Sequence, residues 1–422
     1  GEVVRYRVSV QSGGADDALP RVLGDMRVGG GAELVSTPSG AGVSCQDNSS
    51  LSAFAVDVRC EIAPLQAGIA SPPLDLEVRA LSGPSLEAQV EAIPIASVSS
   101  DPDLSDNTQS ETTTVTPAPV DATAYVAVQG DDQVRAVSAA TNSVIATIAT
   151  GSGPYGLGLR PGTDELWVTN RTGQTITRIS TASNSSIGTV PTQQLLRDDL
   201  FDVAFSPDGG IADVTVNEPV SNAARVVLLN GATGIQITDI RLAQDFPREI
   251  RVLPDGSKAY VTTADGVTVL DLTTNTVAAS IAAAGGAIGL DVAPDGSAVF
   301  YTQRDGTSGL LREIDTGTDA IVGSGIPVGI EPNGVAVSPD GSEAYVANGR
   351  ALVYVVDLIA ETTTVILTGT GTAPQSVDVT SDGTLLFVSD RDGGQVLEID
   401  LATSTVTPTV VGSFPAELVI GN

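Results

Sequence analysis

The feature that most constrains this chain is a short segment that recurs seven times after residue 115. Its clearest copy, residues 338–348, places a Ser-Pro-Asp-Gly turn between two short apolar strands. Proline presets φ in such a turn and glycine accepts the positive φ that ends it, so each copy is predicted to be a β-hairpin. The copies are 40 to 47 residues apart, measured at Pro119, Pro161, Pro207, Pro254, Pro294, Pro339 and Ser381. This period is typical of four-stranded propeller blades, so seven copies predict a seven-bladed ring.

An aromatic residue follows the same position by six residues in six of the copies, and Asp213 replaces it in the third. We predict that these rings pack between neighbouring blades and bind no ligand. The six aromatic residues are Tyr125, Trp167, Tyr260, Phe300, Tyr345 and Phe387.

Three of the copies carry a motif that resembles a known repeat. Leu-Trp-Val-Thr-Asn at 166–170, Ala-Tyr-Val-Thr-Thr at 259–263 and Ala-Tyr-Val-Ala-Asn at 344–348 are similar to the YVTN repeat of seven-bladed propellers from archaeal and bacterial surface-layer proteins. The resemblance covers roughly residues 119–422. It implies a propeller architecture and an extracellular setting, but it fixes no activity, because propellers host many functions.

The propeller segment begins partway through a blade. Strands are expected at 124–128, 134–138 and 143–148, and no strand before Pro119 is available as the innermost one. At the other end, residues 414–421 repeat the pattern of the inner strand at 153–160. We therefore expect the last strand to complete the first blade and close the ring, which hides the edges of an open stack.

Residues 1–115 are predicted to form a β-sandwich, so the whole chain is all-β and residues 116–422 form the propeller domain. Val4, Tyr6 and Val8 alternate with polar residues, as in a half-buried strand. The segment resembles the Ig-like repeat domain of large bacterial and archaeal surface proteins. The resemblance rests on its opening Gly-Glu-Val-Val-Arg-Tyr, on the Val-Ser-Cys and Val-Arg-Cys pair, and on residues 65–68 and 100–107. It implies adhesion or spacing on a surface, without catalysis.

Such Ig-like domains usually begin with one more strand than this sequence supplies before Gly1. One hypothesis is that a strand from a neighbouring subunit or a preceding domain fills the uncovered groove, as in donor-strand polymers. The alternative is that the strand belongs to a longer precursor.

The charge balance is strongly acidic. The chain has 51 acidic and 20 basic residues, a formal net charge of −31, and Lys258 is its only lysine. Such a chain lacks the basic footprint of a general nucleic-acid binder and does not adsorb to anionic membranes. No apolar run reaches the length of a membrane span, so membrane insertion is not expected. The acidic surface favours solubility in saline surroundings or, alternatively, attraction for divalent cations.

The only two cysteines, Cys45 and Cys60, are predicted to form a structural disulfide. In an intracellular protein such a pair is more often reduced or bound to metal. The chain has no histidine to complete a zinc site, and two sulfurs alone are too few. A disulfide that closes so short a loop contributes about 3 kcal/mol in the chain-entropy model.

Two further sets of residues are candidate sites. Asp101, Asp103 and Asp106 could provide oxygen ligands for calcium, although their spacing also suits a simple turn capped by its own side chains. Calcium is the only cofactor that the sequence suggests. Sequons that a glycosylating cell could modify occur at Asn48, Asn170 and Asn184.

Catalysis has little support in the sequence. Without histidine the commonest general base is absent, and so are His-based triads and most catalytic metal sites. Carboxylates are so plentiful that no particular pair stands out. A lactonase-like or quinoprotein-like enzyme, as among some seven-bladed relatives, is therefore the least favoured alternative, and no catalytic residue is predicted.

Four arginines follow the second strand of a blade at similar points of the repeat, namely Arg171, Arg304, Arg350 and Arg391. Ring closure would place them around one rim, where they could bind an acidic partner such as a glycan carboxylate or the flank of a neighbouring subunit. The alternative is internal pairing with Asp132, Asp305 and Asp392, which lie in the same loops.

The sequence therefore predicts a non-enzymatic, extracellular structural or adhesive protein. It would be a building block of a surface layer, sheath or filament that associates with copies of itself. The alternative is a soluble propeller that binds a glycan or a small molecule on its loop-rich face.

Overall fold

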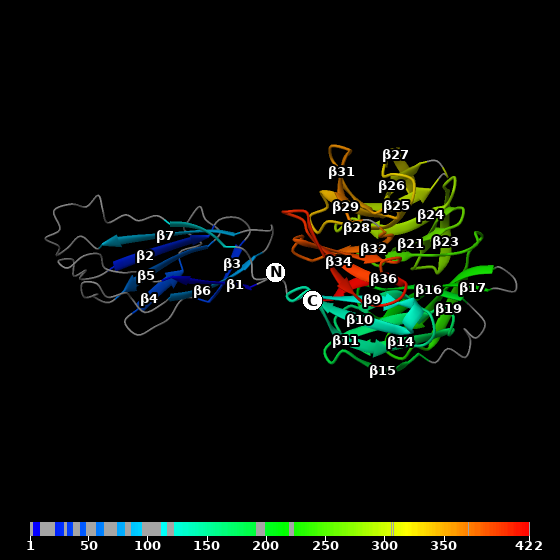
Figure 1. Cartoon of the computed structure of the whole chain (residues 1–422), viewed down its shortest axis with the longest axis horizontal. Helices are drawn as coiled ribbons and strands as arrows, with labels where there is room; N and C mark the ends of the chain where they lie inside the picture. The colour runs from blue at the N-terminus through cyan, green and yellow to red at the C-terminus, as the bar shows by residue number, and fades with distance from the viewer. Residues whose placement is uncertain are drawn as a thin grey trace. The chain divides into compact units, whose positions relative to one another are not determined.

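The computed structural model divides the chain into two compact units, Gly1–Val120 and Asp121–Asn422. It describes the strands within residues 1–115 by their backbone, and it describes residues 122–190, 199–218, 223–304, 306, 308–369 and 371–421. None of the described segments is a helix long and apolar enough to span a bilayer. The two units are described separately below (Figure 1).

The described strands of the first unit form two antiparallel sheets. One has the order β1 (Val3–Val8), β6 (Leu74–Ala80) and β3 (Ala32–Ser36). The other has the order β4 (Val43–Asp47), β5 (Val56–Ile62), β2 (Val22–Val28), β7 (Leu86–Pro94) and β8 (Glu111–Val115). The backbone register sets Cys45 directly opposite Cys60. The side chains and connections of this unit lie outside the described residues, so the Ig-like assignment and the disulfide stay predictions.

The second unit is a seven-bladed β-propeller made of seven four-stranded antiparallel sheets (Figure 1). Blade 1 contains β36 (Pro415–Gly421), β9 (Thr123–Val128), β10 (Gln133–Ser138) and β11 (Ser143–Ala149), from the inside outward. Blades 2 and 3 contain β12 (Pro154–Arg160), β13 (Glu165–Asn170), β14 (Thr175–Ser180) and β15 (Ser185–Thr189), then β16 (Asp199–Phe205), β17 (Ile211–Glu218), β18 (Ala223–Asn230) and β19 (Gln236–Arg241).

The other four blades repeat this order. Blades 4 and 5 contain β20 (Ile250–Val252), β21 (Lys258–Thr263), β22 (Gly266–Asp271) and β23 (Thr276–Ala282), then β24 (Ala287–Val292), β25 (Ala298–Arg304), β26 (Gly309–Asp315) and β27 (Ala320–Pro327). Blades 6 and 7 contain β28 (Pro332–Val337), β29 (Glu343–Asn348), β30 (Leu352–Asp357) and β31 (Thr362–Leu367), then β32 (Pro374–Val379), β33 (Leu385–Asp390), β34 (Gln395–Asp400) and β35 (Thr405–Val410).

The predicted closure of the ring is confirmed. The C-terminal strand β36 pairs antiparallel with β9, with Leu418 opposite Val126 and Gly421 opposite Thr123. Consecutive inner strands contact one another all the way round, and β36 contacts both β32 and β12. The last strand of the chain therefore supplies the inner strand of the first blade.

The turn chemistry read from the repeat is also confirmed. In five blades the aspartate of the turn accepts hydrogen bonds both from a neighbouring Ser or Thr hydroxyl and from a backbone N–H. These residues are Asp208, Asp255, Asp295, Asp340 and Asp382. The glycine that follows has φ between 66° and 74° in each, a conformation that favours glycine. The turns therefore adopt the geometry that their residues prefer.

The aromatic position packs between blades, as predicted. Trp167, for example, is fully buried and meets the ring of Phe205 in the next blade edge to face, with centroids 5.1 Å apart. Two of the phenols donate hydrogen bonds to the following blade; Tyr125, for example, donates to Asn184 Oδ1 at 2.6 Å. The exception, Asp213, is fully buried, and neither of its carboxylate oxygens has a hydrogen-bond partner in the described part of the chain. Burial raises the pKa of Asp213 to about 7.

Five blades are linked to the next by one buried hydroxyl group in the second strand. The hydroxyl accepts a hydrogen bond from the inner strand of its own blade at 2.8–3.0 Å. It also donates to a carbonyl of the next inner strand at 2.5–3.0 Å. These residues occupy the third position of the YVTN-like motif: Thr169, Thr215, Thr262, Thr302 and Ser389. They hold the inner strands in register around the channel and so position the side chains that line it.

Candidate anion-binding site

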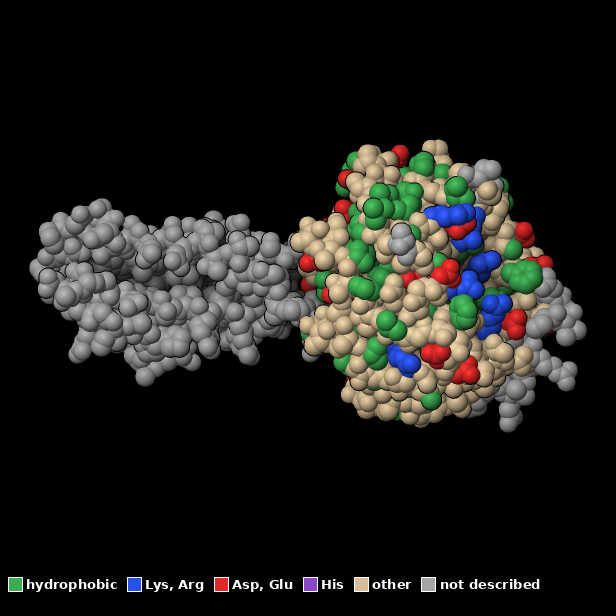
Figure 2. Space-filling view, in the orientation of Figure 1, with side chains coloured by type: hydrophobic (Ala, Val, Ile, Leu, Met, Phe, Trp, Pro, Cys, Tyr) green, Lys and Arg blue, Asp and Glu red, His purple; other side chains and the backbone are tan. Residues whose placement is uncertain are grey.

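A cavity of about 260 Å³ opens where the inner strands begin. Its wall combines arginines with aromatic rings and side-chain amides, contributed by six of the seven inner strands or the residues just before them and by the loops that follow second strands. The lining residues are Gln129, Tyr155, Arg171, Arg248, Ile288, Arg304, Asn333, Gln375, Arg391, Phe414, Pro415 and Ala416. We call this cavity the arginine pocket. Figure 2 shows Lys and Arg side chains gathered together on one face of the propeller.

Three of the four arginines predicted to form a rim line this pocket: Arg171, Arg304 and Arg391. The fourth, Arg350, does not. Its guanidinium lies 2.6 Å from the carboxylate of Glu331 and its side chain is 62% exposed. One inserted residue distinguishes Arg350 from the others. It is separated from Asn348 by Gly349, whereas Arg171, Arg304 and Arg391 directly follow the residue equivalent to Asn348 in their blades.

The structure adds an arginine that the repeat comparison missed. Arg248 precedes β20 and lines the pocket from an inner-strand position. It follows Pro247, just as Tyr155, Asn333 and Gln375 follow a proline at the start of their inner strands. Alignment of these Pro-X pairs was the available signal, because the residues after Pro154, Pro247, Pro332 and Pro374 all line the pocket.

The four arginines of the pocket form no ion pair with a described carboxylate. Arg171 instead lies over the rings of Phe201 and Tyr155, with its guanidinium carbon 4.4 and 5.7 Å from their centroids. Arg391 lies 5.9 Å from the ring of Phe414. The internal pairs expected with Asp132 and Asp392 do not form, and Asp305 lies outside the described residues. Asp132 accepts from the Gly153 backbone N–H instead.

Arg304 shows the electrostatic cost of this arrangement. It donates to the carbonyl of Pro332 at 3.0 Å and to Asn333 Oδ1. Burial lowers the pKa of Arg304 and the positive charge of Arg248 lowers it further, whereas the negative charge of Glu331 raises it in part. Two guanidinium groups that repel one another at a cavity wall are relieved when an anion binds between them.

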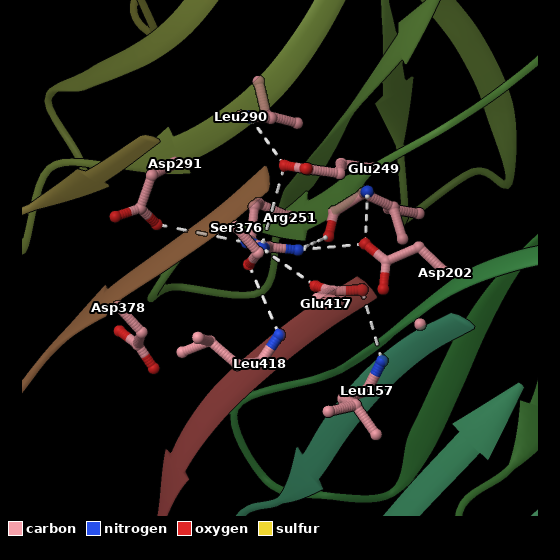
Figure 3. A network of polar contacts seen from close by, with 12 residues as sticks. Leu157, Asp202, Glu249, Arg251, Leu290, Asp291, Ser376, Asp378, Glu417 and Leu418 are labelled. Carbon is pink, nitrogen blue, oxygen red and sulfur yellow. Dashed lines mark hydrogen bonds and ion pairs between the residues drawn. The ribbon is translucent and has the colours of Figure 1, made fainter. Parts of the chain in front are cut away.

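A second charged layer is formed by side chains of the inner strands and the residues beside them (Figure 3). Arg251 of β20 lies among carboxylates from four blades. It donates to Asp202 at 3.0 Å and to Glu417 at 3.4 Å, and it approaches Glu249 and Asp291 at 3.9 and 4.0 Å. With Asp378, these carboxylates form a group of five that we call the acidic belt. Sequence reasoning missed it, because the chain is so rich in acidic residues that no single one is distinctive.

The carboxylates of the belt also bind the backbone of the following blade. Leu157 N–H donates to Glu417, Ile250 N–H to Asp202, and Leu290 N–H to Glu249, at 2.7–3.2 Å. Asp291 and Asp378 accept in the same way from Val337 and Ile420 at 2.7 and 2.8 Å. Each carboxylate therefore has a fixed structural partner as well as a charge.

One guanidinium cannot neutralise five carboxylates, and their pKa values reflect this. Removal from water raises the pKa of Glu249 and Asp378 to about 7 each, and raises the pKa of Glu417 well above its usual value. Tyr155 lines the pocket and is also close enough to the belt for its pKa to respond to both layers. Burial raises its pKa, Glu249 and Glu417 raise it further, and Arg248 and Arg171 lower it. The arginine pocket and the acidic belt are thus within electrostatic reach of one another.

The other predicted sites have different outcomes. Asn170 is fully buried and its amide donates to Thr175 and Thr177, so the folded chain does not present this sequon for glycosylation. Asn184 is half-buried and accepts a hydrogen bond from Tyr125. Asn48 and the calcium candidates Asp101, Asp103 and Asp106 lie outside the described residues. Among the residues that are described, no group of three or more acidic, Cys or His side chains has the arrangement of a metal site.

Comparison with known proteins supports the fold alone. The chain matches no protein-family model and no curated protein. Among solved structures, it is similar to one from Kuenenia stuttgartiensis titled hydrazine synthase, with 18% sequence identity and a TM-score of 0.58. The match covers 66% of this chain and 92% of that one. A likeness at this level of identity supports a β-propeller and carries no activity across.

Proposed function

We propose that this chain is a non-enzymatic, extracellular binding protein whose propeller holds an acidic ligand in the arginine pocket. The observation that carries the proposal is the group of four arginines without a carboxylate partner at one cavity wall. In a chain of net charge −31, arginines have many carboxylates available to them. Arginines kept apart from those carboxylates, at an energetic cost, are typical of a site that receives its anion from outside.

The rest of the lining favours an acidic saccharide as the ligand. A guanidinium group matches a carboxylate with two parallel hydrogen bonds. Phe414 is 51% exposed and offers apolar surface against which a sugar ring can pack. Gln129, Asn333 and Gln375 offer donors and acceptors for hydroxyl groups. A few polar groups at defined positions beside apolar surface are the usual composition of a small-ligand site.

A structural role in a surface layer, sheath or filament is the second candidate. The YVTN-like and Ig-like resemblances favour it, as does the near absence of charged residues from the outer strands of the ring. The two roles are compatible, because a surface protein can both assemble and bind a glycan.

The test of the first candidate is calorimetric titration of the full chain with oligogalacturonate, with the neutral oligosaccharide of the same linkage as the reference. We expect binding of the acidic ligand that weakens as salt is raised. Arg248→Gln and Arg304→Gln should each weaken binding by about tenfold or more. The matched control is Arg350→Gln, which changes an arginine outside the pocket and should leave the affinity unchanged. Equal binding of the neutral ligand, or equal effects of all three variants, would refute the proposal.

A further inference from the structure

The outer strands of the seven blades form the circumference of the ring. Six of them carry no charged residue: β11, β15, β23, β27, β31 and β35. Among the outer strands, only β19 carries charged residues, Asp239 and Arg241. Soluble proteins usually protect exposed sheet edges with charged side chains, proline or bulges. In a chain with 51 acidic residues, uncharged edges are unexpected.

One of these edges, β31, is the best suited to pair with another strand. Its sequence is Thr-Thr-Thr-Val-Ile-Leu, with five β-branched residues and without charge, glycine or proline. The other outer strands each contain glycine, proline, alanine or a charge. β31 is the terminal strand of its sheet, and it pairs only with β30 in the described part of the chain. High β-propensity without charge or proline is the pattern of strands that add to other strands.

Large apolar side chains accompany the open backbone of β31. Val365 is 50% exposed and Leu367 is 72% exposed, and both point to the same side of the sheet. They lie opposite Tyr354 and Leu352 of β30, which are half-buried. The edge of blade 6 therefore presents unpaired backbone groups and an adjoining apolar strip.

We propose that β31 pairs in antiparallel fashion with β31 of a second copy of this chain, which continues blade 6 into an eight-stranded sheet across a two-fold axis. A second copy is the occupant that the charges favour. Two molecules of net charge −31 repel one another over most of their surfaces, and an uncharged edge is where they can approach most closely. An antiparallel edge is also self-complementary, since a two-fold axis places each backbone donor opposite an acceptor.

The contact is small, so the association is weak and depends on salt. A six-residue strand and its adjoining strip bury less surface than a stable dimer requires. Added salt screens the repulsion between the two acidic molecules without weakening the apolar and backbone contacts. The dimer should therefore become stronger as the ionic strength rises, which is the opposite of the behaviour expected for the arginine pocket.

The experiment is sedimentation equilibrium of the full chain up to about 300 µM, in about 0.05 M and 0.5 M NaCl. We expect reversible dimerisation that strengthens severalfold at the higher salt. Val365→Glu should weaken the dimer by about tenfold or more, because it places like charges next to one another across the new strand pair. Leu367→Glu is the second variant, and its position is exposed enough for the blade to fold normally. Ile330→Glu is the matched control, since Ile330 is also 50% exposed but lies in a loop between blades.

The proposal is overturned if the chain stays monomeric throughout this range, which would mean that the edge is bare or covered within the same molecule. It is also overturned if dimers form and both strand variants associate as well as the wild type, which would place the contact elsewhere. Weakening by Val365→Glu and Leu367→Glu but not by Ile330→Glu supports it.

Discussion

The arginine pocket and the acidic belt are adjacent layers of one channel, yet their charges are treated in opposite ways. Each carboxylate of the belt accepts a backbone N–H from the following blade, and four of the five approach Arg251. In the pocket, Arg171 and Arg391 lie over aromatic rings and Arg304 donates to a carbonyl group, and none of its four arginines has a described carboxylate partner. The belt thus joins the blades, whereas the pocket keeps its charges available. Two charged clusters of one channel can therefore have separate roles, and the groups that each cluster contacts indicate which role it has.

The largest change would come from a truncation that damages both layers at once. A chain that ends at residue 413 loses Phe414 and Ala416 from the pocket, Glu417 from the belt, and the whole of β36. The inner edges of β9 and of the neighbouring blades would then be exposed, and we expect the propeller to lose its cooperative unfolding transition. Calorimetry or urea unfolding would show this, and a truncated chain that still unfolds in one sharp transition would contradict it.

The belt alone is broken by Arg251→Met, which keeps the length of the side chain and removes its charge. Four carboxylates would lose their shared cation, and the free energy of unfolding should fall by about 3 kcal/mol or more. Arg350→Met removes an exposed arginine from its pair with Glu331 and should cost less than about 1 kcal/mol. Equal losses in urea unfolding would mean that the belt does not join the blades.

The belt should also give stability a characteristic dependence on pH. A carboxyl group whose pKa is raised by folding keeps its proton in the folded chain where the unfolded chain has lost it. Stability should therefore decrease as pH rises from about 4.5 to about 7, the values of Glu249 in the two states. Glu249→Gln should flatten this slope in urea titrations at several pH values, whereas Glu331→Gln, which changes a carboxylate that is not part of the belt, should preserve it. A wild-type slope of the opposite sign would exclude this account.

The smallest effect couples the two layers. Protonation of Glu249 and Glu417 removes negative charge beside Arg248 and Tyr155, so the pocket should hold an anion more tightly at low pH. We expect affinity for oligogalacturonate, which stays ionised throughout, to rise roughly threefold to tenfold from pH 8 to pH 6. The rise should be smaller in Glu249→Gln, measured by the same calorimetric titration. An affinity that is independent of pH would mean that the layers act separately.

The sequence was most informative where a local pattern determines local structure. The Ser-Pro-Asp-Gly turns specify their own backbone geometry, and the likeness of residues 414–421 to 153–160 was enough to predict the closing strand. The rim of arginines was predicted in part, because equivalent positions of a repeat come together in a ring. Arg350, which follows the extra Gly349, was the exception.

The contacts of the belt could not be predicted in this way. Asp202, Glu249 and Glu417 occupy one equivalent position of the inner strands, and Arg251, Asp291 and Asp378 occupy another. Only the closed ring shows that Arg251 lies within 4.0 Å of four of these carboxylates. These contacts depend on packing across the ring, which the repeat alone does not specify. The burial of Asn170 is similar, because its sequon describes three residues and not the inward direction of the side chain.

The pairing of β36 with β9 has a mechanical consequence. Gly421, near the end of the chain, lies opposite Thr123, where the propeller begins. A force that pulls these two ends apart would peel the strands from one end, breaking their hydrogen bonds in turn, whereas a shearing force would load all of them together. A pull through one end alone places no such tension on this strand pair.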